Sequence, residues 1–125
     1  MKKKDFFTEE FYANPQLTLN ILNELVAKNH VADREMYQNG DFLYMEVYEN
    51  EETRKILAPI ISDFETYKEY NNENFASDYT TQIGLCALQD EHTEAFRSEE
   101  GNKCINWNYQ IESFVFAEDM PSRFD

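Results

Sequence analysis

The stretch "EMYQNGDFLYMEVYEN", residues 35–50, carries the strongest local fold signal in the chain. Asn39 and Gly40 supply the two residues with positive φ that a two-residue type I′ hairpin turn requires. Around this turn, apolar and polar residues alternate as they do in a strand with one buried face. The sequence therefore predicts a β-hairpin with strands over residues 34–38 and 41–48.

The second predicted strand has two different faces, because successive side chains of a strand point to opposite sides. Leu43, Met45 and Val47 share one face, which we expect to point into the core. The opposite face carries Phe42, Tyr44, Glu46 and Tyr48. This second face is either covered by another element or available to a partner.

Two helices are predicted before the hairpin. Residues 5–12 form a short helix with an apolar side, and residues 15–29 form a longer one. Asn14 stands in the N-cap position of the second helix, and Pro15 is its first residue, where the missing N–H costs nothing.

Three elements are predicted after the hairpin. A helix follows Asn50 and continues to about residue 70, with Pro59 expected to kink or restart it. Residues 79–88, short, apolar and β-branched at their start, predict a buried strand. Asp90 can then cap a helix that runs to Glu100 and ends at Gly101.

The last predicted strand is "CINWNYQIE", residues 104–112, in which Ile105, Trp107, Tyr109 and Ile111 alternate with polar residues. Phe114 and Phe116 fall on the face opposite to Trp107 if the strand continues. We therefore expect either a bulge near Ser113 or a strand end that is covered on both sides.

This order of elements predicts an α+β fold, with a small antiparallel sheet made of the hairpin and two further strands, and helices packed on one face. The 125 residues match the usual size of one domain, so we expect a single compact domain over residues 1–125. Residues 118–125 are expected to be a frayed acidic tail.

Charge is distributed unevenly along the chain. Residues 1–30 are balanced, whereas the remaining 95 residues hold seven basic and 21 acidic side chains and account for the net charge of -14. Direct nucleic-acid binding is disfavoured, because neutralising phosphates requires the opposite charge. No apolar run approaches the ~20 residues that span a bilayer, and no export signal is evident, so we expect a cytoplasmic protein without a membrane role.

Residue patterns typical of catalysis or of cofactor binding are missing from the sequence. His30 and His92 have no metal-ligand partner four residues away, and His92 is expected to be solvated on an acidic helix. Cys86 and Cys104 are expected to be buried structural thiols within strands. Pairs of neighbouring carboxylates follow from the 25 acidic residues alone. We expect no enzymatic activity, no cofactor and no metal.

Protein binding is the function that these features favour. Acidic side chains attract a basic partner, and exposed rings anchor it at low entropic cost. The candidate phosphate substitutes are Glu51, Glu52, Asp63, Glu65, Glu69, Glu73 and Asp78, and the candidate anchors are Tyr44, Tyr48 and Tyr70. The alternative is that the rings between residues 64 and 79, which are Phe64, Tyr67, Phe75 and Tyr79, belong to the core and that the acids only solvate this segment.

In size and charge the chain resembles phage-encoded antagonists of restriction and CRISPR nucleases, and equally bacterial immunity proteins against nuclease toxins. This resemblance implies an inhibitor that blocks the nucleic-acid-binding surface of a basic enzyme, with mimicry of DNA or RNA as one way of doing so. The average charge, about one per 500 Å², is about fivefold below that of a duplex, so mimicry requires clustered acids. The alternative function is an assembly or regulatory module whose aromatic faces form a homodimer seam.

Overall fold

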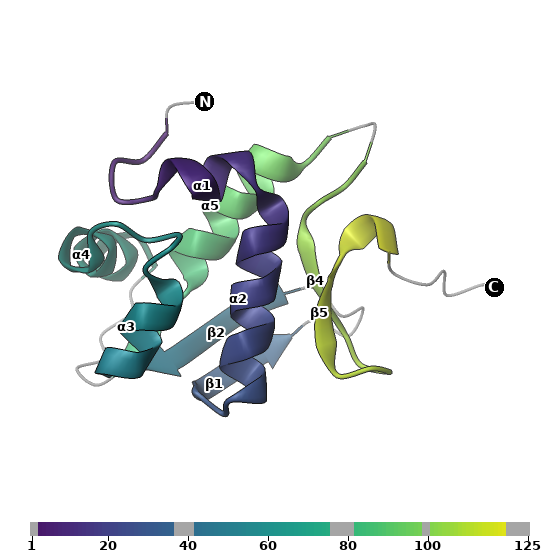
Figure 1. Cartoon of the computed structure of the whole chain (residues 1–125), viewed down its shortest axis with the longest axis horizontal. Helices are drawn as coiled ribbons and strands as arrows, with labels where there is room; N and C mark the ends of the chain where they lie inside the picture. Colours follow the sequence, from purple (N-terminus) through teal and green to yellow (C-terminus); the bar gives the residue numbers. More distant parts are fainter. Residues whose placement is uncertain (1–2, 37–41, 76–81, 99–100, 120–125) are drawn as a thin grey trace.

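The computed structural model describes residues 3–36, 42–75, 82–98 and 101–119, with the backbone alone for residues 32–36 and 42–44 (Figure 1). In chain order, the elements are α1 (Glu9–Ala13), α2 (Pro15–Ala27), β1 (Val31–Met36), β2 (Phe42–Tyr48), α3 (Glu51–Leu57), α4 (Phe64–Phe75), β3 (Gln82–Gly84), α5 (Cys86–Phe96), β4 (Ile105–Asn108), β5 (Ser113–Phe116) and the short 3₁₀ helix η1 (Ala117–Asp119). The α+β class is confirmed.

The strands are divided between two antiparallel sheets instead of being gathered in one. The first sheet has the order β1-β2-β3, with β2 in the centre, and the second consists of β4 and β5. In Figure 1, α2 crosses in front of the first sheet, α4 lies at the left edge, and β4 and β5 stand at the right.

The predicted pairing of β1 with β2 is confirmed, although β1 begins at Val31, three residues earlier than expected. The Asn39-Gly40 turn lies outside the described residues. Met45 and Val47 are fully buried, as predicted for the core face. Glu46 is also fully buried, so the opposite face of β2 is covered at this point, whereas Tyr48 at the end of the strand is 47% exposed.

The first helix begins at Glu9 and not at residue 5, because the side chain of Thr8 accepts a hydrogen bond from the Phe11 N–H and caps the helix there. The residues before this helix instead form a short extended segment that is hydrogen-bonded to residues 60–62. Thr8 N–H donates to the Ile60 carbonyl at 3.1 Å, and Ser62 N–H donates to the Phe6 carbonyl at 2.8 Å. These hydrogen bonds place Phe6 and Phe7 in the core.

The second helix starts at Pro15 as predicted, and its inner face holds the second sheet. From α2, the Asn23 side chain accepts from the Phe114 N–H at 2.7 Å and donates to the Phe114 carbonyl at 3.1 Å. These are the two hydrogen bonds that a neighbouring strand would make with β5. A single amide therefore fixes the position of β5 against α2.

The expectation of one strand over residues 104–112 is wrong, because the chain turns after Asn108. The side chain of Asn108 accepts from the backbone N–H groups of Gln110 and Ile111, and Glu112 has a φ of 51°. An Asx turn of this kind reverses the chain without any glycine. Trp107 and Phe114 become cross-strand partners with ring centroids 4.9 Å apart, so no bulge is needed to bury both.

Pro59 was expected either to kink the helix after Asn50 or to restart it. It lies between two separate helices, so the second outcome is the observed one. α3 is capped by Asn50, whose side chain accepts from the Thr53 N–H at 2.8 Å, and it ends at Leu57. α4 starts at Phe64 and continues to Phe75, five residues beyond the predicted end.

The expected strand over residues 79–88 and helix over residues 90–100 are both displaced. Within the described part of this segment, β3 covers only Gln82–Gly84, and α5 begins at Cys86 and ends at Phe96. Gly101 does not close this helix; a side chain at this position would meet the Glu118 carboxylate, since its Cβ would lie 2.7 Å from Oε2.

The early start of α5 depends on two side chains of α4. Asn71 accepts from the Ala87 N–H at 2.8 Å, and the Tyr67 hydroxyl accepts from the Leu88 N–H at 3.3 Å. The same hydroxyl donates to the Gly84 carbonyl at 2.9 Å. The unpaired N–H groups of the first turn of α5 are thus satisfied from another helix, without a local capping side chain.

Replacing Tyr67 by phenylalanine tests the hydrogen bonds that its hydroxyl makes with Gly84 and Leu88. Tyr67→Phe keeps the buried ring but leaves a buried carbonyl and a buried N–H without their partner, so the free energy of unfolding should fall by about 1–3 kcal/mol. Chemical denaturation measures the change. Tyr48→Phe is the matched control at an exposed ring and should change stability by less than about 0.5 kcal/mol. Equal stability of the two variants contradicts a stabilising role for the Tyr67 hydroxyl.

Candidate partner-binding surface

The outer face of α4 carries three predicted site residues in one row. Glu65, Glu69 and Glu73 follow each other at intervals of four residues, and all three are exposed. The inner face of the same helix is buried through Tyr67 and Asn71. Residues four apart lie above one another on a helix, so these three acids form one stripe, which we call the α4 acidic ridge.

The positively charged side chains near the ridge form ion pairs mainly with Glu49, which is not part of the ridge. Arg54 and Lys68 both pair with this carboxylate, Lys68 at 2.7 Å, and Arg54 also reaches Glu65 at 3.1 Å. Partial burial opposes ionisation of Glu49, but the hydrogen bonds from Lys68 and Arg54 outweigh it and hold its pKa below the usual value. Within the described residues, Glu69 and Glu73 form no ion pair.

Asp63 has a structural role in addition to its exposed charge. Its carboxylate accepts from the Thr66 hydroxyl at 2.7 Å and from the Thr66 N–H at 3.2 Å, which caps the start of α4. These hydrogen bonds lower the pKa of Asp63. A negative charge is thereby held at the start of the helix that carries the ridge.

Glu51 and Glu52 stand in the first turn of α3 and are oriented differently from the ridge. Glu51 is paired with Lys55 at 3.5 Å on its own helix. Glu52 is directed toward α2, where it lies 3.9 Å from Lys28 and 3.5 Å from His30. The predicted acids therefore divide into a group on α4 and a pair on α3, while Asp78 lies outside the described residues.

The candidate anchors receive mixed support. Tyr48 is exposed, whereas the side chain of Tyr44 lies outside the description. Tyr70 was expected to be an exposed contact but is half-buried, because its ring packs 5.2 Å from that of Phe6 and the Lys4 ammonium covers it at 4.9 Å. Of the rings assigned to the core by the alternative interpretation, Tyr67 is fully buried and Phe75 is 38% exposed.

The expectation of a solvated His92 is wrong. The ring is 2% exposed, lies against the rings of Phe11 and Phe96, and has Nε2 at 2.9 Å from the Lys103 carbonyl. Burial lowers the pKa of His92 to about 4. The histidine is therefore neutral near pH 7 and ties α5 to the segment before β4.

The cysteines differ from each other. Cys104 is buried as expected, but it precedes β4 instead of lying within it. Cys86 is only partly buried and starts α5. Burial and the nearby charge of Glu46 raise the pKa of the Cys86 thiol to about 11. A thiol in this state is a poor nucleophile at neutral pH.

A partly buried polar contact was not foreseen from the sequence. The Tyr12 hydroxyl donates to the carboxylate of Glu91 at 2.7 Å and accepts from the Lys4 N–H at 2.8 Å. Burial, followed by the contact with Glu91, raises the pKa of Tyr12. The partners are 79 residues apart, so no local pattern indicates this link between the amino-terminal segment and α5.

The described residues contain no group of three or more His, Cys, Asp or Glu side chains that could hold a metal ion. None of the helices in the described ranges is long and apolar enough to cross a membrane. No known protein-family model matches the chain, and neither a curated protein nor a solved structure shows significant similarity to it.

The buried state of His92 predicts a specific pH dependence. A histidine in the unfolded chain takes up a proton near pH 6.5, whereas folded His92 does so only near pH 4. Between these values the unfolded state binds more protons, so this residue should lower the free energy of unfolding by about 3 kcal/mol as the pH falls from about 6.5 to about 4.

The variant His92→Gln isolates this effect, because glutamine can still donate to the Lys103 carbonyl but does not titrate. Denaturant unfolding at a series of pH values should show a smaller loss of stability on acidification for the variant than for the natural chain. Identical pH slopes contradict the assignment.

Proposed function

We propose that the protein is a small acidic inhibitor that binds a basic target protein, a nuclease or another nucleic-acid-binding enzyme, and covers the surface with which the target holds nucleic acid. The observation that carries the proposal is the α4 acidic ridge, whose three carboxylates point away from the core. Charges arranged in this way steer a basic partner and fix its register.

The spacing of the ridge supports a partial imitation of a nucleic-acid strand. A helix rises about 1.5 Å per residue, so carboxylates four residues apart are about 6 Å apart along the axis. Phosphates of one duplex strand follow at about 3.4 Å of axis, so the ridge substitutes for about every second phosphate. Residues 49–75 hold seven acids and three bases, so this segment carries a net charge of -4.

The alternative of a homodimer seam built from aromatic faces has less support. Trp107, Phe114 and Phe116 are buried within the chain itself and cannot reach a second copy without unfolding. Among the large apolar side chains that the structure describes between residues 104 and 116, only Tyr109 and Ile111, at the turn between β4 and β5, are exposed. Catalysis forms no part of the proposal, and the buried His92 and the raised pKa of the Cys86 thiol agree with that.

Neutralising the ridge tests the proposal. The double variant Glu69→Gln/Glu73→Gln removes two exposed charges that pair with no described residue, so the fold should remain intact. Inhibition is measured as the loss of DNA or RNA cleavage by a panel of basic nucleases. For a nuclease that the natural chain inhibits, the variant should bind about tenfold more weakly.

The matched control is Asp90→Asn/Glu94→Gln, which removes two exposed charges four residues apart on α5. It should leave inhibition within about twofold of the natural chain. Equal losses in both double variants indicate a general charge effect and contradict a role for the ridge. Failure of the natural chain to inhibit any basic nuclease contradicts the proposed function itself.

A further inference from the structure

The amino-terminal segment carries two lysines whose ammonium groups lie over tyrosine rings. The Lys4 ammonium is 4.9 Å from the centre of the Tyr70 ring, and the Lys3 ammonium is 5.2 Å from the centre of the Tyr12 ring. A cation at this distance is attracted by the negative face of the ring. We call Lys3 and Lys4 the amino-terminal lysine pair.

The position of Tyr70 brings one of these cations to the distal end of the α4 acidic ridge. Tyr70 precedes Glu73 by three residues on α4, so the two side chains are neighbours on the helix surface, about 60° apart around its axis. Tyr70 is half-buried and Glu73 is exposed, so the ring lies at the border between the buried face and the ridge. The charge of Lys4 therefore weakens the negative potential beside Glu73.

The backbone of this segment is fixed, whereas its lysine side chains are open to solvent. The Lys4 N–H donates to the Tyr12 hydroxyl at 2.8 Å, and the Lys4 carbonyl accepts from the Phe7 N–H at 3.3 Å. Phe6 and Phe7 are buried in the core. Lys3 is exposed and Lys4 is partly exposed, and contacts between a cation and a ring are weak at such sites. The ammonium groups can therefore leave the rings without a change in the fold.

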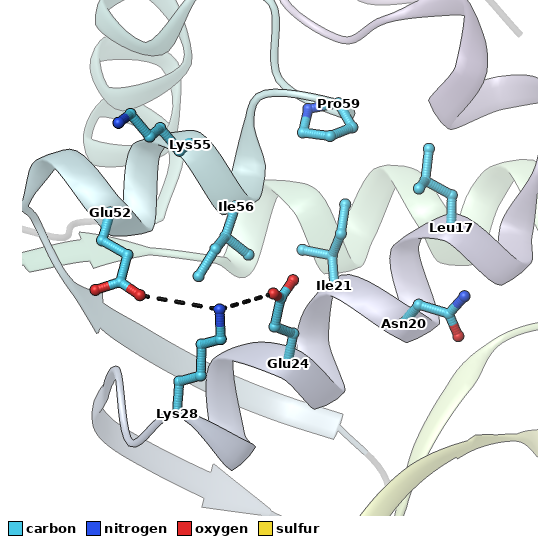
Figure 2. Close-up of a pocket in the computed structure, with 9 residues that line it drawn as sticks. All are labelled: Leu17, Asn20, Ile21, Glu24, Lys28, Glu52, Lys55, Ile56 and Pro59. Atoms are coloured by element: carbon cyan, nitrogen blue, oxygen red, sulfur yellow. Dashed lines mark ion pairs between the residues drawn. The ribbon is translucent and has the colours of Figure 1, made fainter.

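Two other lysines are held by carboxylates and supply a matched control. Figure 2 shows Lys28 between Glu24 and Glu52, at 3.1 Å and 3.9 Å, in a groove between α2 and α3. Lys55 lines the same groove and pairs with Glu51 at 3.5 Å. Removing these two charges changes the net charge by the same amount as removing the amino-terminal lysine pair.

We propose that the amino-terminal lysine pair is an internal competitor for the basic partner. In the free protein, Lys4 occupies the face of Tyr70 next to Glu73; in the complex, a cationic side chain of the partner takes this place. Arginine is favoured, because its guanidinium stacks on an aromatic face and can donate to a carboxylate at the same time. The inference rests on the proposed function, since it concerns the regulation of the same ridge.

The double variant Lys3→Gln/Lys4→Gln removes the competitor. The probe is a fluorescently labelled nona-arginine peptide, whose binding to the full chain is measured by anisotropy at about 50 mM salt. The variant should bind this peptide about fivefold more tightly than the natural chain does. The control Lys28→Gln/Lys55→Gln should stay within about twofold of the natural chain. Equal affinities of the two double variants, or no binding by either, overturn the inference.

The displacement itself is followed by NMR of the natural chain. The Tyr70 ring shields the ε-methylene protons of Lys4, so their signals should lie upfield of those of a free lysine. At a saturating concentration of nona-arginine, the signals should return to the position of a free lysine. Signals that remain upfield in the complex mean that Lys4 keeps its place, which overturns the inference.

These measurements separate the inference from the proposed function. If both lysine double variants bind nona-arginine equally while Glu69→Gln/Glu73→Gln loses inhibition of a nuclease, the internal competition is wrong and the proposed function stands. If no nuclease is inhibited although Lys3→Gln/Lys4→Gln binds nona-arginine more tightly than its control does, the proposed function fails and the competition remains a property of this surface.

Discussion

The contact on which the structure most depends is the one between the inner face of α4 and the start of α5. Tyr67 is fully buried, and its hydroxyl hydrogen-bonds both the Gly84 carbonyl and the Leu88 N–H. Asn71, one turn after Tyr67 on α4, accepts from the Ala87 N–H. These side chains end β3, begin α5 and orient α4 at once. Because buried backbone groups must be paired, the arrangement leaves α4 little freedom to rotate.

This constraint also determines what α4 presents to solvent. With Tyr67 and Asn71 turned inward, the residues on the opposite side of the helix must face outward, and three of them are glutamates. Arg54 and Lys68 form ion pairs with Glu49 at the edge of the helix. Within the described residues, Glu69 and Glu73 therefore form no ion pair. The negative surface is thus a consequence of how the core anchors α4.

The sequence was sufficient where a signal is local. Pro15 and Asn50 mark helix starts by the chemistry of single residues, and the alternation around Asn39-Gly40 correctly predicts the pairing of β1 with β2. The alignment of Glu65 with Glu69 follows from helical spacing within the predicted helix. Glu73 joins them only because α4 continues to Phe75, beyond the predicted end near residue 70.

The remaining features depend on contacts between distant residues. The start of α5 is stabilised from α4, 16 and 21 residues earlier, and the environment of His92 is formed by Phe11 and the Lys103 carbonyl. The turn after Asn108 uses an Asx turn and a positive φ at Glu112, so it lacks the glycine by which a hairpin is usually recognised. Tyr70 was misjudged because the segment that covers it, with Phe6 and Lys4, is 60 or more residues away.

The salt dependence of target binding tests the central claim most directly, namely that an outward-facing acidic stripe holds a basic partner. The dissociation constant of the complex with an inhibited nuclease is measured from about 50 mM to about 500 mM monovalent salt, a range over which the Debye length falls by about a factor of three. The account predicts that affinity decreases steeply and that the Glu69→Gln/Glu73→Gln variant shows a shallower dependence. An affinity that is unchanged by salt, with the same slope in both proteins, contradicts it.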